Sequence, residues 1–358
     1  MKHFEFTGNV KINAFGVKLH EIRCTVAFGN VKVGDVGGWI EKEDNLCDDA
    51  WVYDDARVYG NARVYGNAQV YGNARVYDDA RVCGDARVYD DAQVYGNALV
   101  CGDARVYGNA RVCGDARVCG NARVYGNARV CDDAQVCGNA QVCGNAQVYG
   151  NAQVYGAARV CDNALVYGDA RVCDDALVYG NARVYGNAQV CDDAQVCDDA
   201  QVYGNAQVYG NAQVYGNARV CDDARVYGDA RVYGDARVYG NAQVYGNAQV
   251  FGNARVYGDA QVCDNALVCG DARVYGEARV YGEARVYSNA DYCCFQSFGS
   301  RNRTTTVFRT TTEICVSCGC FFGSLDEFAQ AVEKTHGDNK YGKAYKAMIE
   351  LIKVRFSE

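Results

Sequence analysis

A cysteine-rich segment near the end of the sequence has the residue types and the spacing of a metal site. Residues 315–320 read Cys-Val-Ser-Cys-Gly-Cys, so that Cys315 and Cys318 form a C-x-x-C pair and Cys320 follows two residues later. This spacing suits zinc, for which His336 or a further cysteine would complete four ligands. A second ligand pair at matching spacing is absent from the sequence. Buried thiols in a strand are the alternative interpretation, and no cofactor other than zinc is expected.

Acid–base chemistry has few candidate residues in this sequence. Histidine, the side chain most often used as a general base, occurs only at His3, His20 and His336. His20 lies in an alternating segment that predicts a surface strand, and His336 lies at the predicted end of a helix. If the protein is an enzyme, His20 and His336 are the catalytic candidates; otherwise both are structural.

One six-residue repeat dominates the elements that would position these residues. From Asp49 to Ala290 the unit V-Y/C-G/D-N/D-A-R/Q recurs without insertion or deletion. Alanine occupies every sixth position from Ala50, and valine does so from Val52 to Val286. Because strand side chains alternate, a Val two residues after each Ala shares its face, which must be the interior. The pair of Gly, Asn or Asp residues in each unit then supplies a tight corner.

The repeat unit and the segment before it both resemble a known family. Residues 58–63 read Val-Tyr-Gly-Asn-Ala-Arg, an aliphatic residue followed four places later by a small one. This unit resembles the hexapeptide family of left-handed parallel β-helices. Residues 34–46, Gly-Asp-Val-Gly-Gly-Trp-Ile-Glu-Lys-Glu-Asp-Asn-Leu, are similar to the entrance of uncharacterised bacterial and phage proteins of this kind, including a transferase-like group. The resemblance implies an all-β solenoid, a left-handed parallel β-helix of about 13 triangular coils of 18 residues each.

The same resemblance implies one enzymatic activity and one assembly. Many hexapeptide β-helices are acyltransferases that use an acyl-CoA donor, form trimers, and place a histidine base beside a loop extruded from the helix. The repeat of this chain contains neither a histidine nor such a loop. We therefore expect a non-catalytic structural or interaction scaffold, a rigid β-helical rod that binds a partner at its ends. Acyl transfer is the alternative, and a homotrimer is compatible with both.

Positions 18 residues apart lie above one another in such a fold, so the outward side chains should form ladders. The members of two such ladders are Tyr53, Tyr71, Tyr89, Tyr107 and Tyr125 in one, and Cys83, Cys101, Cys119 and Cys137 in the other. Aromatic ladders can bind flat ligands or bases, but more often they stabilise a sheet. Stacked cysteines would approach disulfide distance if oxidised, which we interpret as damage.

Composition and charge restrict the partners and the compartment. The chain has a formal net charge of −8, and residues 49–291 carry 21 Arg against 30 Asp and Glu. This acidic, interleaved pattern argues against nucleic acid and favours a protein partner. No apolar segment reaches the length of a signal or a membrane span, so a membrane is not expected. Cysteines that merely replace tyrosine in a repeat favour a reducing, cytoplasmic compartment.

Three domains are predicted. They are an N-terminal β cap over residues 1–48, the hexapeptide β-helix over residues 49–290, and a small α+β domain over residues 291–358 that caps the rod and binds the partner.

The last domain is predicted to combine strands and helices. Residues 304–308 and 314–316 have the composition of strands. Ser324 and Glu327 form a capping box that opens a helix. A second helix is expected over residues 341–356, where apolar residues recur at helical spacing.

Overall fold

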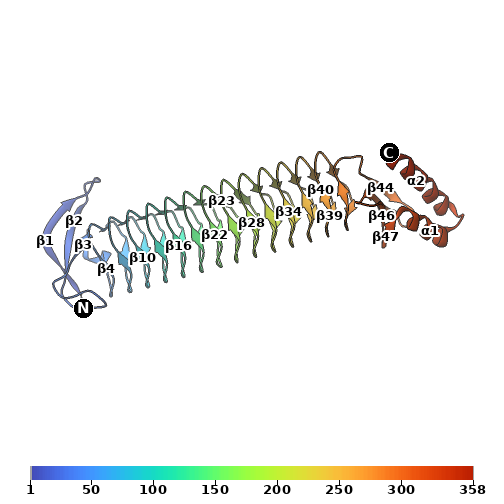
Figure 1. The fold of residues 1–358 in the computed structure, drawn as a ribbon. Helices are drawn as coiled ribbons and strands as arrows, with labels where there is room; N and C mark the ends of the chain where they lie inside the picture. The colour runs from blue at the N-terminus through green and yellow to red at the C-terminus, as the bar shows by residue number, and fades with distance from the viewer. Residues whose placement is uncertain (1, 358) are drawn as a thin grey trace. The chain divides into compact units, whose positions relative to one another are not determined.

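The protein is a parallel β-solenoid of about 14 coils with a small C-terminal region of sheet and helices. The structure, a computed structural model, describes residues 2–357. The chain divides into two compact units, residues 1–187 and 188–358, each containing stacked coils (Figure 1). The prediction of a solenoid is confirmed, whereas its left-handed sense stays a prediction. No helix among the described residues is long and apolar enough to cross a membrane.

The first unit begins with an antiparallel sheet that runs into the solenoid. Strand β1 (Phe4–Ile12) pairs with β2 (Lys18–Cys24), and β2 pairs with β3 (Val36–Ile40). Strand β3 then pairs in parallel with β5 (Arg57–Val58), the first coil's strand on that side. A short 3-10 helix, η1 (Glu43–Asn45), follows β3. A Cβ at Gly38 would lie 2.7 Å from the side chain of Val52, which explains the glycines before Trp39.

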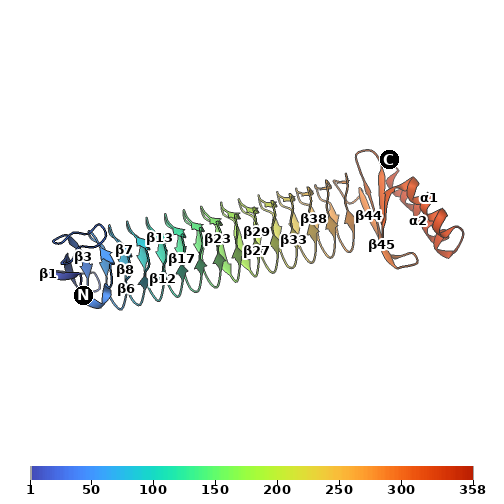
Figure 2. The same ribbon diagram turned by 90° about the horizontal axis from the view of Figure 1, so that it is seen from below.

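The coils are built from very short strands that recur every six residues. In the first unit, two-residue strands run from β4 (Trp51–Val52) to β22 (Arg159–Val160). They are followed by β23 (Leu165–Gly168), β24 (Arg171–Val172), β25 (Leu177–Val178) and β26 (Arg183–Gly186). In the second unit, two-residue strands run from β27 (Gln189–Val190) to β43 (Arg285–Val286). Within each unit, strands of neighbouring coils pair in parallel at a spacing of 18 residues, as Val112 does with Val130. The stacked strands are seen in Figure 2.

The interior of both units is made of the repeated Ala and Val side chains. From Ala50 to Val286 these residues are almost completely buried. Ala290 is the exception, because it is exposed although its position in the repeat predicts an inward side chain. The backbone turns away at Ser288 and Asp291, where Asp291 N donates a hydrogen bond to Ser288 O. The interior therefore ends one unit earlier than the sequence pattern.

The corners need backbone conformations that only a few residues adopt. The first corner residue has a positive φ throughout, for example +72° at Gly126 and +59° at Asp132. Glycine has no Cβ to clash there, and Asp tolerates the left-handed region. An Asp at this corner also accepts a hydrogen bond from the next coil, as Asp132 Oδ2 does from Gly150 N at 3.1 Å. The second corner residue is often Asn, and Asn127 Nδ2 donates to Asn145 Oδ1 at 3.0 Å.

The second unit ends in an antiparallel sheet covered by two helices. The sheet contains β44 (Tyr292–Phe298), β45 (Arg303–Arg309), β46 (Ile314–Cys318) and β47 (Phe321–Ser324). It lies between the last coils of this unit and the helices α1 (Leu325–His336) and α2 (Lys340–Phe356) (Figures 1 and 2). The predicted capping box is present, since Ser324 Oγ accepts from Glu327 N and the Glu327 carboxylate accepts from Ser324 N.

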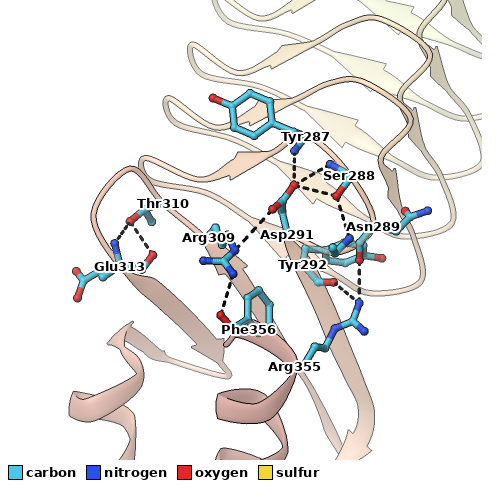
Figure 3. A network of polar contacts seen from close by, with 11 residues as sticks. Tyr287, Ser288, Asn289, Asp291, Tyr292, Arg309, Thr310, Glu313, Arg355 and Phe356 are labelled. Atoms are coloured by element: carbon cyan, nitrogen blue, oxygen red, sulfur yellow. Dashed lines mark hydrogen bonds and ion pairs between the residues drawn. The ribbon is translucent and has the colours of Figure 1, made fainter. Parts of the chain in front are cut away.

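A polar network joins the last coil of this unit to the sheet (Figure 3). The carboxylate of Asp291 accepts hydrogen bonds from the N–H groups of Tyr287 and Ser288 at 3.1 and 2.9 Å. The Arg309 guanidinium lies 3.7 Å from the same carboxylate and donates to Phe356 O at 2.8 Å. One aspartate thus holds the turn out of the solenoid and links it, through Arg309, to the end of α2.

We expect Gly126→Val to destabilise the protein more than Gly126→Asp does. A β-branched side chain at this positive φ costs about 2 kcal/mol. Asp already occupies the equivalent corner at Asp132 with the same conformation. Urea unfolding followed by circular dichroism measures the difference, and equal midpoints for the two variants would refute the account of the corners.

We expect Asp291→Ala to loosen the junction between the last coil and the sheet. It removes an acceptor shared by two backbone N–H groups, at a cost of about 2 kcal/mol. Hydrogen exchange measured by mass spectrometry should become faster over residues 287–298. Asp326→Ala, which changes an exposed residue in the first turn of α1, serves as the control and should leave exchange there unaltered.

A candidate binding pocket in the C-terminal region

A pocket opens on the C-terminal sheet of the second unit. It is formed by the turn between β44 and β45, the turn between β46 and β47, and one side of each helix. The lining residues are Phe298, Ser300, Arg301, Arg303, Cys318, Gly319, Cys320, Phe321, Phe328, Ala331, Val332, Thr335, His336 and Tyr345. None of these described lining residues carries a carboxylate, so the pocket combines apolar walls with only positive or neutral polar groups.

Tyr345 organises the apolar part of the pocket. Its ring stacks on His336 with centroids 5.6 Å apart and meets Phe298 and Phe328 edge-on at 5.4 and 5.7 Å. Burial, and then its hydrogen bond with Cys318, raise the pKa of the Tyr345 hydroxyl well above its usual value. The hydroxyl therefore stays protonated at neutral pH. A Cβ at Gly299, whose φ is +74°, would collide with this hydroxyl, so the turn before Arg301 requires glycine there.

Two arginines supply the positive charge of the pocket. Arg301 is exposed in the turn that follows β44, and Arg303 opens β45. The Arg303 guanidinium crosses Gly319, where a Cβ would lie 2.8 Å from Nη1. Arg303 also borders a second pocket, lined by Asp259, Gln261, Glu277, Arg279, Asn302, Arg303, Thr304, Ser317 and Gly319. That second pocket has carboxylates of its own, and Thr304 Oγ1 donates to Glu277 Oε2 at 2.7 Å.

Three of the four predicted metal ligands line the same pocket, but they do not form a compact cluster. Cys318, Cys320 and His336 line the pocket, whereas Cys315 does not. Cys315 is buried near the other end of β46, where burial raises the pKa of its thiol. In the described part of the chain, no three ligand atoms of these four residues lie within 4.8 Å of one another. Zinc binding stays a prediction that would need the side chains to move.

The two candidate bases make ring contacts. His20 on β2 stacks on Phe6 with centroids 4.8 Å apart, and its backbone pairs with Ile40. His336 ends α1 and stacks on Tyr345. Both contacts are with aromatic rings, which position an imidazole without activating it. His3, the third histidine, is buried, and its Nε2 lies 3.0 Å from Ala50 O.

The predicted ladders are present in the first unit. Tyr71, Tyr89, Tyr107 and Tyr125 stack in sequence with centroid distances of 4.7 to 5.0 Å, and Tyr53 meets Tyr71 edge-on at 6.3 Å. In the cysteine ladder, the sulfurs of Cys101 and Cys119 lie 3.0 Å apart. Cys83 and Cys137 extend this ladder at its two ends through contacts with these two thiols.

Sequence reasoning missed the pocket and two of the strands that frame it. Strands β44 and β47 were not predicted, because Cys, Gln and Ser interrupt the first and the second is only four residues long. Two signals were available: the pair of arginines in a polar turn and the Phe321-Phe322 run before a capping box. Neither signal shows that the two turns converge on Tyr345.

Comparison with known proteins places the repeat in a family. A model of the YdcK beta solenoid repeat matches residues 56–138, 140–156, 158–192 and 194–276, which together exceed half of the chain. No curated protein sequence is detectably similar to the chain. The matched residues are those of the stacked coils, and neither the N-terminal sheet nor the pocket is included. The chain belongs to the YdcK β-solenoid repeat family.

Proposed function

We propose that the protein is a non-catalytic scaffold whose C-terminal pocket binds a short segment of a partner protein. The segment would carry acidic side chains beside an aromatic or aliphatic one. The stacked coils would serve as a rigid spacer that presents this pocket. The observation that carries the proposal is the pocket itself, which joins an aromatic floor to arginines with no lining carboxylate.

The chemistry of the pocket supports this class of partner. Phe298, Phe328 and Tyr345 offer flat apolar contacts of the kind that anchor aromatic or aliphatic side chains at interfaces. Arg301 and Arg303 present planar guanidinium groups, which bind carboxylates through two parallel hydrogen bonds. A ligand that satisfies both features has one apolar side chain next to one or two carboxylates, as an acidic peptide has.

The contrast with the repeat supports the scaffold interpretation over acyl transfer. The repeat contains no histidine, and its corners follow one another without an extruded loop. A transferase of the hexapeptide-repeat group would need both a base and a cofactor groove along the coils. Membership of that group, a left-handed coil and a trimer stay as expectations from resemblance, as does a cytoplasmic location. None of them is needed for the pocket to bind a peptide.

Selection of random twelve-residue peptides on the immobilised full-length protein tests the proposal. We expect enriched peptides with Asp or Glu next to a Phe, Leu, Trp or Tyr. Arg301→Glu should weaken their binding about tenfold, which corresponds to about 1.4 kcal/mol, because it places like charges in contact. Arg301 is exposed in a turn, so this change should leave the fold intact.

Arg111→Glu is the matched control for this experiment, since Arg111 is exposed on a coil far from the pocket in sequence. It changes the net charge of the protein by the same amount and should leave peptide binding unaltered. Peptides that lack acidic residues, or that bind the Arg301 and Arg111 variants equally well, would argue against the proposed function.

A further inference from the structure

Two thiols on successive coils of the first unit lie unusually close together. The sulfurs of Cys113 and Cys131 are 2.6 Å apart and share a hydrogen bond. In the same column, Tyr95 occupies the position one coil before Cys113, and Tyr149 occupies the position one coil after Cys131. The pair is therefore bounded by tyrosines on both sides. Cys143 and Cys161 form a second pair of the same kind, between Tyr125 and Tyr179 in their column. In the longer run of four cysteines, Cys101 and Cys119 each have two cysteine neighbours, so a pair bounded by tyrosines is the clearer case.

The backbone fixes this pair in a geometry that suits a covalent bond between coils. Strands β14 (Arg111–Val112) and β17 (Arg129–Val130) are parallel and in register, with Val112 opposite Val130. Cys113 N donates to Val130 O at 3.0 Å, which holds the two cysteines on adjacent rungs. Adjacent rungs are about 4.8 Å apart, within the range of Cα separations that a disulfide spans.

The surroundings leave the pair accessible and activate one thiol. Both cysteines are half-buried, and a shallow pocket lined by Arg129, Cys131, Asp132, Gln147, Val148 and Tyr149 opens beside them. The hydrogen bond with Cys131, and a further one with Tyr95, lower the pKa of the Cys113 thiol to about 7 in spite of its burial. The lowered pKa favours the thiolate of Cys113, which is the reactive form.

We propose that Cys113 and Cys131 form a redox-active dithiol that a peroxide oxidises to a disulfide between successive coils. The Cys113 thiolate attacks one peroxide oxygen, the O–O bond breaks, and the departing hydroxide takes up a proton as water. The Cys131 sulfur then attacks the resulting sulfenic acid, the S–S bond forms, and the second oxygen leaves as water. Two protons and two electrons pass from the thiols to the peroxide, which is reduced to two water molecules. A thiol reductant would reverse the reaction by exchange.

This reaction differs from the interpretation of stacked cysteines as mere sites of damage. A low-pKa thiol that is only half-buried and a resolving thiol on the adjacent coil are together features of a reversible redox site. Cys221 supplies the contrast within the same chain. Its column neighbours are Tyr203 and Tyr239, and burial raises the pKa of its thiol. The inference is independent of the peptide pocket.

Differential alkylation of the full-length protein tests the proposal. Trypsin releases the same peptide, VCGDAR, around Cys83 and around Cys113, so the measurement is made in Cys83→Ser protein. After brief treatment with hydrogen peroxide at pH 7, we expect residues 112–117 linked to residues 130–159, with fragmentation locating the bond at Cys131. Cys113 should be oxidised roughly ten times faster than Cys221, because its greater ionisation outweighs the lower nucleophilicity of a low-pKa thiolate.

Two further measurements make the outcome decisive. Adding Cys131→Ser should abolish the linked peptide and leave a Cys113 sulfenic acid that a 1,3-dione reagent traps, while Cys221→Ser should leave the linkage unaltered. The rate of Cys113 oxidation should rise with pH through about 7 and then level off. Equal rates for Cys113 and Cys221, or oxidation of Cys113 without linkage to Cys131, would overturn the proposal.

Discussion

Within each unit, the structure depends on the in-register stacking of each residue on the one 18 positions away. Backbone bonds such as Arg87 N to Ala104 O at 2.9 Å and Tyr89 N to Val106 O at 3.0 Å repeat this relation from coil to coil. Because these bonds fix the register, each inward Val lies on a Val of the next coil and each inward Ala lies on an Ala. No coil can bury its Val and Ala side chains alone, so stability is collective. The register is strongly specified for the same reason, since a shift of one residue would bring every Val to the outer face.

The same constraint places like outward side chains next to one another along a column of the solenoid. A Tyr placed above a Tyr becomes a stack, and an Asn above an Asn becomes a hydrogen-bonded row, as with Asn127 and Asn145. A Cys above a Cys becomes a dithiol, as with Cys113 and Cys131. At one repeated position, the residue one coil away therefore decides whether a ring stack or a thiol pair forms. The C-terminal sheet is free of this constraint, and there Arg301 and Tyr345, which come from different elements, line one pocket.

Features that depend on the period of the repeat could be predicted from the sequence. Features that depend on several distant segments meeting in space could not. The spacing of Ala and Val predicted the buried face, and the Gly and Asp corners predicted the positive φ values. The capping box at Ser324 predicted the start of α1. The pocket could not be predicted, because two turns and two helices meet there without any sequence spacing in common. The contact between Cys113 and Cys131 could be predicted only in part. The period of the repeat places the two cysteines in one column, but the 2.6 Å separation of their sulfurs depends on side-chain rotamers. The exposed Ala290 shows that the sequence repeat continues for one unit beyond the last buried coil residue.

We propose that the coils are a scaffold that lacks a catalytic site of the hexapeptide acyltransferase kind. Calorimetric titration of the purified full-length protein with acetyl-CoA tests it most directly, because such a transferase must bind its thioester donor. The account predicts heats of dilution only. Saturable binding at a fixed stoichiometry would contradict the scaffold interpretation and make the outer face of the coils a candidate cofactor groove.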